Sequence, residues 1–380
     1  MKRLKTIKLG YLVNFRNGHD VKQTTSGLVP LYGSGGIFGS TDEIMGVGPS
    51  VLFGRKGTLD RPDYVEGPFA HVDTAYSTVM LERTHARFLY YWATTVPYWL
   101  YSTQTAIPSM TSFTLSQLSV PVYDLDTQRR IAEYLDTETA QIDTMMAKLD
   151  ELVELLGERR ASVVKTLLDD APAKGKAPLY LVLSRHFPGE WGDDEGKGEF
   201  DVKCVRVADF NRETKTANSD VETIRSITRA KFNEKKLWPG DVLVERSGGS
   251  KKKPVGNTFF YNGDDDAICA NFIQVLRLNS DNDPKFWNYL LAQAYDRGDF
   301  KVLYNQTTGI QNLQMDLFLQ KRYPVIPLDE QRRIAEHLDV ATTRIDTMID
   351  KCNELRDLLQ ERRAALITAV VTGQKEVPHV

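Results

Sequence analysis

Residues 128–161 read QRRIAEYLDTETAQIDTMMAKLDELVELLGERRA, and residues 331–364 read QRRIAEHLDVATTRIDTMIDKCNELRDLLQERRA. The offset between the two stretches is 203 with no gap, and 22 of the 34 aligned positions are identical. Identity at this level over a gapless alignment indicates a duplicated structural unit and not a biased composition. We therefore interpret the chain as two halves, each with a variable region followed by one copy of this segment.

The similarity continues upstream of the two segments. At the same offset, residues 107–110 (IPSM) align with residues 310–313 (IQNL). Further upstream, residues 51–57 (VLFGRKG) are similar to residues 242–248 (VLVERSG). The duplication therefore includes the region in front of each segment.

Each copy of the segment predicts a long helix with a coiled-coil seam. Apolar residues recur at alternating steps of four and three, the 3.5-residue period of a helix that packs against another helix. Asp126 and Asp329 are the expected N-caps, because an aspartate accepts hydrogen bonds from the free N–H groups of a first turn. Two such seams in one chain can pair with each other, most simply antiparallel. The expected seam positions are Ile131, Leu135, Ile142, Met145, Leu149, Leu152 and Leu156 in the first helix, and Ile334, Leu338, Ala341, Ile345, Met348, Cys352, Leu355 and Leu359 in the second.

The regions outside the two helices predict globular α+β domains. Short β-type runs between glycine turns accompany one helical stretch in each region, at 87–101 and at 285–297. The predicted fold class is α+β, with two globular domains separated by two long helices that form an antiparallel coiled coil, and with an internal pseudo-twofold repeat. Residues 169–178 (DDAPAKGKAP) are the expected linker after the first helix. The expected boundaries are 1–125 and 171–326 for the globular domains, 126–170 and 327–373 for the helices, and 374–380 for a C-terminal tail.

Composition excludes several classes of protein. Of the 380 residues, 41% are hydrophobic and 26% are charged, which is an ordinary globular composition and not that of a disordered chain. No run approaches the roughly 18 apolar residues of a membrane span, and the basic N-terminus lacks the apolar core of a secretory signal. Cys204, Cys269 and Cys352 lie too far apart for a metal knuckle or a disulfide framework. We expect a cytoplasmic protein with no membrane contact.

Charge is distributed unevenly along the chain. The net charge is −3, which argues against a protein that coats nucleic acid with its whole surface. Residues 200–262 nevertheless hold 13 Lys and Arg against 8 Asp and Glu, a balance of +5. Such a region can contact DNA phosphates locally.

Three local patterns are tested as catalytic or cofactor sites. Residues 33–39 (GSGGIFG) are compatible with a structural turn, a nucleic-acid contact loop or a nucleotide site, although a nucleotide loop should open directly into a helix. Asp241 and Glu245 lack the further acid and the lysine of a nuclease cluster, and His71 is expected to be a hydrogen-bonded polar group. A paired-histidine metal motif, a P-loop, a nucleophile elbow and the [DN]-P-P-[YF] motif of enzymes that methylate amino groups are all missing. We therefore predict no catalytic residue, metal site or cofactor in this chain.

The remaining candidates are basic and amide side chains that suit DNA. Arg and Gln can form bidentate hydrogen bonds with guanine and adenine edges, and Lys favours phosphates. The lysine run at 251–253 follows a Ser/Gly loop, and it is compatible with a solvated loop as well as with a phosphate contact. The candidate DNA-binding residues are Ser34, Arg55, Lys56, Gln104, Arg246, Ser247, Lys251, Lys252, Lys253 and Gln306.

Pairs of arginines occur near the start and in the second half of both helices. They are compatible with a solvated helix surface and with contacts to a partner subunit. The candidate partner-binding residues are Arg129, Arg130, Arg159, Arg160, Arg332, Arg333, Arg362 and Arg363.

Taken together, these motifs resemble a known family. Residues 326–335 (IPLDEQRRIA), followed by Ile345-Asp346 and by residues 361–363 (ERR), resemble the specificity (S) subunit of type I restriction–modification systems. The stretches that resemble target-recognition domains of that family are 30–39 (PLYGSGGIFG), 52–57 (LFGRKG) and 72–75 (VDTA) in the first half and 238–248 (WPGDVLVERSG) in the second.

The resemblance implies a non-catalytic subunit with two target-recognition domains, each recognising one half of a bipartite site in double-stranded DNA. It implies that the helices bind two methyltransferase (M) subunits, which use S-adenosylmethionine to methylate adenine N6, and that restriction (R) subunits with ATP and Mg²⁺ join them. Residues 123–128 (YDLDTQ) depart from the family's Pro-Leu-x-Glu-Gln pattern, which we interpret as drift at the helix entrance. Two alternatives stay open: a coiled-coil assembly protein without DNA specificity, and a DNA-modification enzyme with an unrecognised site.

Overall fold

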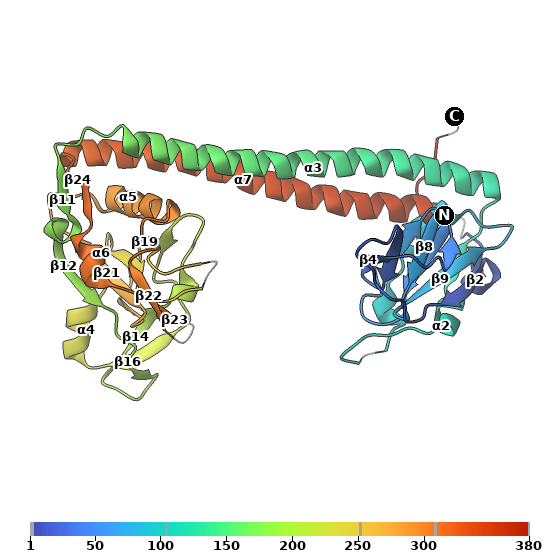
Figure 1. The fold of residues 1–380 in the computed structure, drawn as a ribbon, viewed down its shortest axis with the longest axis horizontal. Coiled ribbons are helices and arrows are strands. Elements are labelled where there is room, and N and C mark those ends of the chain that lie inside the picture. Colours follow the sequence, from blue (N-terminus) through green and yellow to red (C-terminus); the bar gives the residue numbers. More distant parts are fainter. Residues whose placement is uncertain (1–3, 104, 251–252, 308–309, 379–380) are drawn as a thin grey trace. The chain divides into compact units, whose positions relative to one another are not determined.

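The chain divides into two compact units, which are described separately. The computed structural model describes residues 4–103, 105–250, 253–307 and 310–378. The first unit comprises Met1–Leu152 with Lys351–Val380, and the second comprises Val153–Asp350. Each unit therefore holds one globular domain and a part of both long helices, α3 (Leu125–Asp169) and α7 (Leu328–Val371) (Figure 1).

In the first unit, α3 and α7 lie antiparallel. Arg363 donates from Nε and Nη2 to the carboxylate of Asp143 at 2.8 and 3.2 Å, and Arg356 donates from Nη1 to Asp150 at 3.4 Å. The residue number rises along α3 as it falls along α7, which is the order of an antiparallel pair. The predicted antiparallel pairing of the two helices is confirmed.

The second unit repeats one of these ion pairs. Arg160 donates from Nε and Nη2 to the carboxylate of Asp346 at 2.8 and 3.3 Å. Arg160 and Arg363 are 203 residues apart, and so are Asp143 and Asp346. The duplication seen in the sequence therefore also holds for a contact between the helices.

The seam between the helices uses only part of the predicted positions. Ile142, Leu156, Ile345, Cys352 and Leu359 are buried as expected. The prediction is wrong for the seam positions between them, because Met145, Leu152, Met348 and Leu355 are 56%, 43%, 52% and 48% exposed. Their neighbours Met146, Val153 and Ile349 are half-buried in their place.

The predicted helix caps are shifted at both helix starts. Asp126 lies inside the first turn of α3, and Asp124 is the residue whose Oδ1 accepts from the backbone N–H of Thr127, at 2.7 Å. Asp329 likewise lies in the first turn of α7. An acidic side chain in a first turn still interacts favourably with the helix dipole, so both residues remain suited to a helix start.

The globular domain of the first unit consists of several small sheets and helix α1 (Ala86–Ala93). Strand order is β2-β9-β6-β7 in one four-stranded sheet and β4-β3-β8-β5 in another, and β1 pairs with β10. The short helix α2 (Ser112–Ser116) precedes β10. The strands are β1 (Thr6–Lys8), β2 (Val13–Asn17), β3 (Val29–Gly33), β4 (Gly36–Thr41), β5 (Gly46–Val47), β6 (Ser50–Gly54), β7 (Asp63–Val65), β8 (Pro68–His71), β9 (Ala75–Met80) and β10 (Ser119–Pro121).

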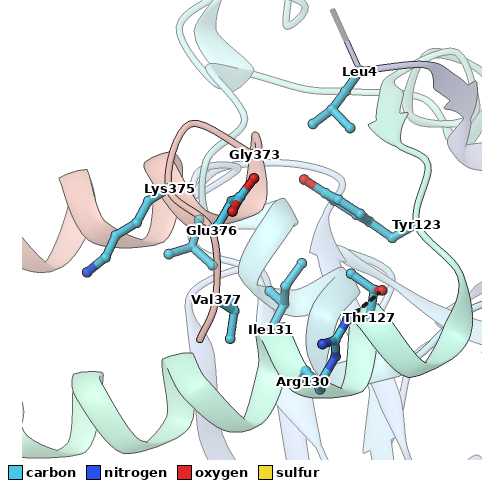
Figure 2. A pocket seen from close by; sticks show the side chains of 10 residues that line it. Leu4, Tyr123, Thr127, Arg130, Ile131, Gly373, Lys375, Glu376 and Val377 are labelled. Atoms are coloured by element: carbon cyan, nitrogen blue, oxygen red, sulfur yellow. Dashed lines mark hydrogen bonds between the residues drawn. The ribbon is translucent and has the colours of Figure 1, made fainter. Parts of the chain in front are cut away.

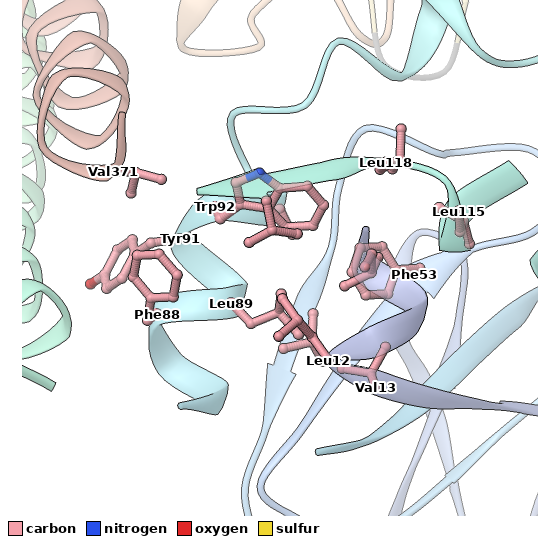
Figure 3. Packing of buried hydrophobic residues seen from close by; sticks show 14 of the residues in the cluster. Leu12, Val13, Phe53, Phe88, Leu89, Tyr91, Trp92, Leu115, Leu118 and Val371 are labelled. Atoms are coloured by element: carbon pink, nitrogen blue, oxygen red, sulfur yellow. The ribbon is translucent and has the colours of Figure 1, made fainter. Parts of the chain in front are cut away.

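The core of this domain is continuous with the long helices. Phe88, Leu89 and Trp92 of α1 pack beside Phe53 of β6, and Val371 at the end of α7 belongs to the same cluster (Figure 3). A shared core fixes the domain on the helices, because separating them would expose this apolar surface to water.

The globular domain of the second unit is larger. Its main sheet has the order β12-β21-β17-β19-β15, a second sheet has the order β13-β16-β14-β20, and β18-β23-β22 form a three-stranded sheet. Its helices are α4 (Arg229–Lys235), α5 (Pro284–Asp296) and α6 (Met315–Gln320). The strands are β11 (Lys176–Pro178), β12 (Leu183–Pro188), β13 (Asp193–Asp194), β14 (Phe200–Val205), β15 (Thr216–Ala217), β16 (Ile224–Ile227), β17 (Val242–Glu245), β18 (Ser247–Gly248), β19 (Thr258–Tyr261), β20 (Ala267–Cys269), β21 (Ile273–Leu278), β22 (Tyr304–Thr307), β23 (Ile310–Leu313) and β24 (Arg322–Pro324).

Two expected loops have defined structures. The segment predicted as a linker ends in β11, which pairs antiparallel with β24. The glycine-rich residues 33–39 form the turn and part of the hairpin of β3 and β4. Because a strand and not a helix follows this turn, it is not a nucleotide-binding loop of the strand–turn–helix type. No helix in the described ranges is long and apolar enough to cross a membrane.

A buried glutamine joins the first domain to its helix. Gln128 of α3 accepts at Oε1 from the backbone N–H of His85, which precedes α1, at 2.9 Å. Its Nε2 donates to the carbonyl oxygens of Arg83 and Tyr123, both at 3.0 Å. One amide thus satisfies three backbone groups at the junction of α1 and α3.

The same arrangement occurs in the second unit. Gln331 of α7 accepts at Oε1 from the backbone N–H of Asp283, the N-cap of α5, at 2.9 Å. Its Nε2 donates to the carbonyl of Ile326 at 2.8 Å and to Oδ1 of Asn282 at 3.1 Å. Gln128 and Gln331 are 203 residues apart. The junction between domain and helix is therefore part of the duplicated unit.

A tyrosine on each domain helix provides a second repeated contact. The hydroxyl of Tyr91 in α1 donates to Asp136 of α3 at 2.6 Å. The hydroxyl of Tyr289 in α5 donates to Asp339 of α7 at 3.0 Å. Asp136 and Asp339 are again 203 residues apart, although the two tyrosines are not.

Candidate nucleic-acid interface

Three of the predicted DNA-binding residues lie together in the first unit. The backbone N–H groups of Arg55 and Lys56 donate to the carbonyl of Thr74 at 2.7 and 3.3 Å, and Ser34 N–H donates to Oγ1 of the same threonine at 3.3 Å. Gly57 has a φ of +86°, and a Cβ at this position would lie 3.3 Å from Oγ of Ser34. A glycine here permits the left-handed turn that brings the two loops together.

The two basic residues of this loop differ in exposure. Arg55 is half-buried, because its Nη1 donates to the carbonyl of Asp73 at 3.2 Å and its guanidinium lies 5.9 Å from the ring centre of Tyr76. Lys56 is exposed, and its backbone forms an isolated bridge with Ser109. Arg55 is thus held in place, whereas the ammonium group of Lys56 faces solvent, as a phosphate contact requires.

In the second unit, Arg246 joins β17 to β18, and Ser247 is the first residue of β18. The N–H of Arg246 donates to the carbonyl of Phe272 at 2.9 Å, and the carbonyl of Arg246 accepts from Leu313 at 2.8 Å. The hydroxyl of Ser247 donates to Oδ1 of Asn312 at 2.6 Å. Ser247 therefore contacts β23, a strand to which the sequence analysis assigned no candidate.

The lysine run and the two candidate glutamines lie partly outside the described residues. Lys251, Lys252 and Gln104 lie outside the described residues. Lys253 is exposed, and its N–H donates to the hydroxyl of Ser250 at 3.1 Å in a tight turn. Gln306 lies in β22, where its backbone pairs with Gln311.

The acidic residues Asp241, just before β17, and Glu245, at its end, are structural. The carboxylate of Asp241, which is 1% exposed, accepts from Nε and Nη2 of Arg277, both at 2.8 Å. Glu245 is also buried and is paired with Arg212. Burial raises the pKa of Glu245, although the neighbouring Arg212 acts in the opposite direction. Within the described ranges, no group of three or more His, Cys, Asp or Glu side chains is placed to hold a metal ion.

His71 differs from its expected state. The imidazole is 1% exposed, and its Nδ1 has no hydrogen-bond partner among the described residues. Burial lowers the pKa of His71, because the charged form loses its hydration. The expected hydrogen bonding of the ring is thus not seen at Nδ1, although the backbone of Val72 and Ala75 acts to raise the pKa of His71. The ring packs against Phe69 at 6.1 Å between centroids.

The candidate partner-binding arginines have different environments. Arg160 and Arg363 are engaged in the ion pairs between the helices, and Arg129 and Arg333 pair within their own helices with Asp126 and Glu330. Five members of the set are exposed: Arg129, Arg159, Arg332, Arg333 and Arg362. Contact with a partner subunit stays a prediction for all eight.

Arg130 borders a cavity of about 310 Å³ at the C-terminal end of the first unit (Figure 2). Its Nη2 donates to the hydroxyl of Thr127 at 3.1 Å. The residues that follow α7 form the other wall, and Nζ of Lys375 donates to the hydroxyl of Tyr134 at 2.8 Å. Lys375, Glu376 and Val377 of the expected C-terminal tail thus lie beside the start of α3.

The sequence analysis missed a set of exposed apolar residues on the long helices. They occur as repeat-related pairs at the offset of 203, so the same surface exists on both helices. The available signal was that the two residues of each pair are identical. The sequence analysis assigns two of the pairs to the seam and gives the third pair no role. The exposed pairs are Met145 with Met348, Leu152 with Leu355, and Leu155 with Leu358.

Known proteins are similar to this chain in sequence. Residues 200–356 match the family model of the type I restriction modification DNA specificity domain. The type I restriction enzyme StySPI specificity subunit of Salmonella potsdam is 22% identical over 272 residues, which cover 68% of this chain and 58% of that relative. The match therefore spans less than two thirds of the relative's length.

Two solved structures have a similar fold. A chain from a structure described as the structural basis of complex assembly and conformational transition of the type I R-M system superposes with a TM-score of 0.67, at 16% identity and with 99% of both chains covered. The HsdS subunit from Thermoanaerobacter tengcongensis superposes with a TM-score of 0.51, also at 16% identity, over 99% of this chain and 98% of that chain. The predicted fold class, α+β with two long antiparallel helices, is confirmed. The predicted resemblance of this chain to the specificity subunits of type I restriction–modification systems is confirmed as well.

Proposed function

We propose that the chain is the DNA-specificity subunit of a type I restriction–modification complex. In this proposal residues 1–125 and 171–326 are target-recognition domains, residues 126–170 and 327–373 are the helices between them, and residues 374–380 are a tail. The observation that carries the proposal is the duplicated junction, in which Gln128 and Gln331 fix a globular domain on a helix in the same way. Two similar junctions that hold domains with different loops are suited to the recognition of two different short DNA sequences.

The exposed apolar residues of the helices support the docking of methyltransferase subunits. Met145 and Met348 lie beside the seam, which Met146 and Ile349 already occupy. A helix with a second apolar surface is suited to pack against a further helix. Because this surface occurs once on each helix, the proposal has two M subunits binding in equivalent ways.

A repeated cleft supports the same stoichiometry. In the second unit a cleft of about 320 Å³ lies between α3 and α5, and in the first unit a cleft of about 670 Å³ is bounded by α7. Five lining residues of one cleft are related to five of the other by the offset of 203. These residues are Gly157, Arg160, Ala161, Val164 and Lys165 in one, and Gln360, Arg363, Ala364, Ile367 and Thr368 in the other.

The proposal assigns all chemistry to partner subunits. S-adenosylmethionine belongs to the M subunits, which methylate adenine N6, and ATP with Mg²⁺ belongs to the R subunits. The structural use of Asp241 and Glu245 supports a non-catalytic role, because both carboxylates are buried and paired with arginines. An active acid of a nuclease must instead reach the metal ion and the phosphate.

Methylome sequencing tests the proposed function. Cells that express this chain with the M subunit from the same genome should show N6-methyladenine in one bipartite sequence, and deleting the chain should remove this methylation. The purified chain alone, supplied with DNA, Mg²⁺, ATP and S-adenosylmethionine, should neither methylate nor cut. Methylation that persists without the chain, or turnover by the chain alone, would overturn the proposal.

Replacing the exposed methionines should weaken the complex with the M subunits. Met145→Lys and Met348→Lys each place a charge where an apolar contact is expected, and burial of a methionine contributes about 1.5–3 kcal/mol. We therefore expect each variant to lose at least about tenfold in affinity for one M subunit. Isothermal titration calorimetry with the purified M subunit measures the loss and the stoichiometry.

The control for this prediction is Glu154→Lys, an exposed position on the opposite side of α3. It adds a lysine to the same helix and should leave the affinity unchanged. Since all three positions are exposed, none of the variants should lower the free energy of unfolding by more than about 0.5 kcal/mol. A variant that carries both Met145→Lys and Met348→Lys should bind both M subunits more weakly. If its binding is unchanged, this surface is not the docking site.

A further inference from the structure

Three polar side chains form a row across the small sheet of the second domain. Ser247 of β18 pairs with Asn312 of β23, and Asn312 pairs with Asn305 of β22. Residues directly opposite each other in an antiparallel sheet project from the same face, with their Cβ atoms about 4.5–5.5 Å apart. The three side chains therefore stand side by side on one face of the sheet.

This face is the one that meets solvent. Along β23, Ile310 and Asn312 are exposed, whereas Gln311 and Leu313 are buried. The amide of Gln311 accepts from the backbone N–H of Val255 at 3.2 Å, so the opposite face is packed against the domain. Only the face of the sheet that carries the row is therefore accessible to a ligand.

Hydrogen bonds fix the orientation of both asparagine amides. Oδ1 of Asn312 accepts from the hydroxyl of Ser247 at 2.6 Å, and Oδ1 of Asn305 accepts from Nε2 of Gln314 at 2.7 Å. In the part of the chain that the structure describes, the Nδ2 groups of the two asparagines have no acceptor. Two oriented amide donors are thus available to a ligand without a cost for arranging them.

We propose that Ser247, Asn312 and Asn305 form the base-recognition row of the second target-recognition domain. This inference rests on the proposed function and assigns the contact to specific residues. A two-stranded β-ribbon fits the major groove of B-DNA, where N7 of purines, O6 of guanine and O4 of thymine accept hydrogen bonds. The two Nδ2 groups take these acceptors.

The dimensions of the row limit how much DNA it covers. Neighbouring strands lie about 4.8 Å apart, so the outer two side chains are about 9.6 Å apart. Base pairs are stacked about 3.4 Å apart. The row therefore spans at most about three adjacent base pairs, all of them in one half of the bipartite site. The other half-site and the gap do not depend on it.

The test compares the methylomes of cells that express the full chain and its variants with the M subunit from the same genome. Asn312→Asp and Asn305→Asp keep the shape and replace the amide donor by an acceptor, which suits the N4–H₂ group of cytosine or the N6–H₂ group of adenine. We expect the ratio of methylation between the original and an altered base to change by about tenfold or more, at adjacent positions of one half-site. The matched control is Asn262→Asp, which makes the same change at an exposed residue after β19.

The outcomes separate the row from the function on which it rests. If the wild-type chain directs no bipartite methylation, the proposed function fails. If the wild type directs it and both variants keep the wild-type base preference, only the row is overturned. Should both variants fail to fold in a thermal unfolding assay, Ser247→Ala decides. It frees the amide of Asn312 and should broaden the base preference at the same position, and an unchanged preference would overturn the row.

Discussion

Asp241→Asn is expected to lower the free energy of unfolding of the second unit by about 3–5 kcal/mol. The wild-type carboxylate binds the guanidinium of Arg277 through two hydrogen bonds of 2.8 Å and also accepts from the backbone N–H of Trp238 at 2.8 Å. Arg277 is only 14% exposed. Removing one member of a buried ion pair leaves the other charge without compensation, which costs about this much.

The measurement is unfolding in urea, with hydrogen–deuterium exchange to show which unit has changed. The control is Asp266→Asn, because Asp266 pairs with Lys236 in the same domain, but both side chains are well exposed, at 54% and 38%. An exposed ion pair contributes about 0–1 kcal/mol, so this variant should be almost as stable as the wild type. Equal losses in the two variants would contradict the structural role of the Asp241–Arg277 pair.

The fold could be predicted to a large extent because of the repeat. Two copies of one segment at a constant offset predict two equivalent helices, and the antiparallel arrangement then follows from pairing similar seams. The junctions were not predicted, although Gln128 and Gln331 are identical in both copies. A glutamine at the start of an amphipathic helix is usually exposed, and only the packed structure shows that it bonds to the backbone of another element.

The register of the seam illustrates where periodicity is insufficient. Met145 and Met146 are adjacent, and so are Leu152 and Val153. From Ile142, steps of three and four reach Leu149 through either Met145 or Met146. From Leu149 they reach Leu156 through either Leu152 or Val153. The choice depends on the partner helix, where Asp346 and Arg363 form ion pairs across the seam. The sequence of one helix does not contain this information.

Some of the candidate DNA-binding residues can be predicted from the local sequence, and others depend on the packed structure. Lys56 and Lys253 lie in loops, where exposure follows from local composition. The row of Ser247, Asn312 and Asn305 depends on which residues are opposite each other across three strands. Ser247 and Asn312 are 65 residues apart, so the pairing of β18 with β23 is not visible in the sequence. The alignment of residues 107–110 with 310–313 indicated the region but not the role of any side chain.

Replacing the junction glutamines should destabilise one unit each. Gln331→Met keeps the length of the side chain but removes hydrogen bonds to Asp283 N–H, Asn282 and the carbonyl of Ile326. A buried polar group left without a partner costs about 1–3 kcal/mol, so we expect the second unit to lose about 3 kcal/mol of its free energy of unfolding. Gln128→Met should have a similar effect on the first unit, since it also removes three hydrogen bonds.

Hydrogen–deuterium exchange distinguishes this junction role from a general loss of helix stability. Faster exchange should be concentrated at the start of α5 and at β24 for Gln331→Met, and at the start of α1 and at β10 for Gln128→Met. Gln141→Met, an exposed position on α3, is the control and should change the free energy of unfolding by less than about 0.5 kcal/mol. If the glutamines only favoured helix formation, methionine, a comparable helix former, would be tolerated at all three positions. A loss of stability in the adjacent domain for Gln128→Met and Gln331→Met, but not for Gln141→Met, would instead show that each glutamine holds its globular domain on its helix.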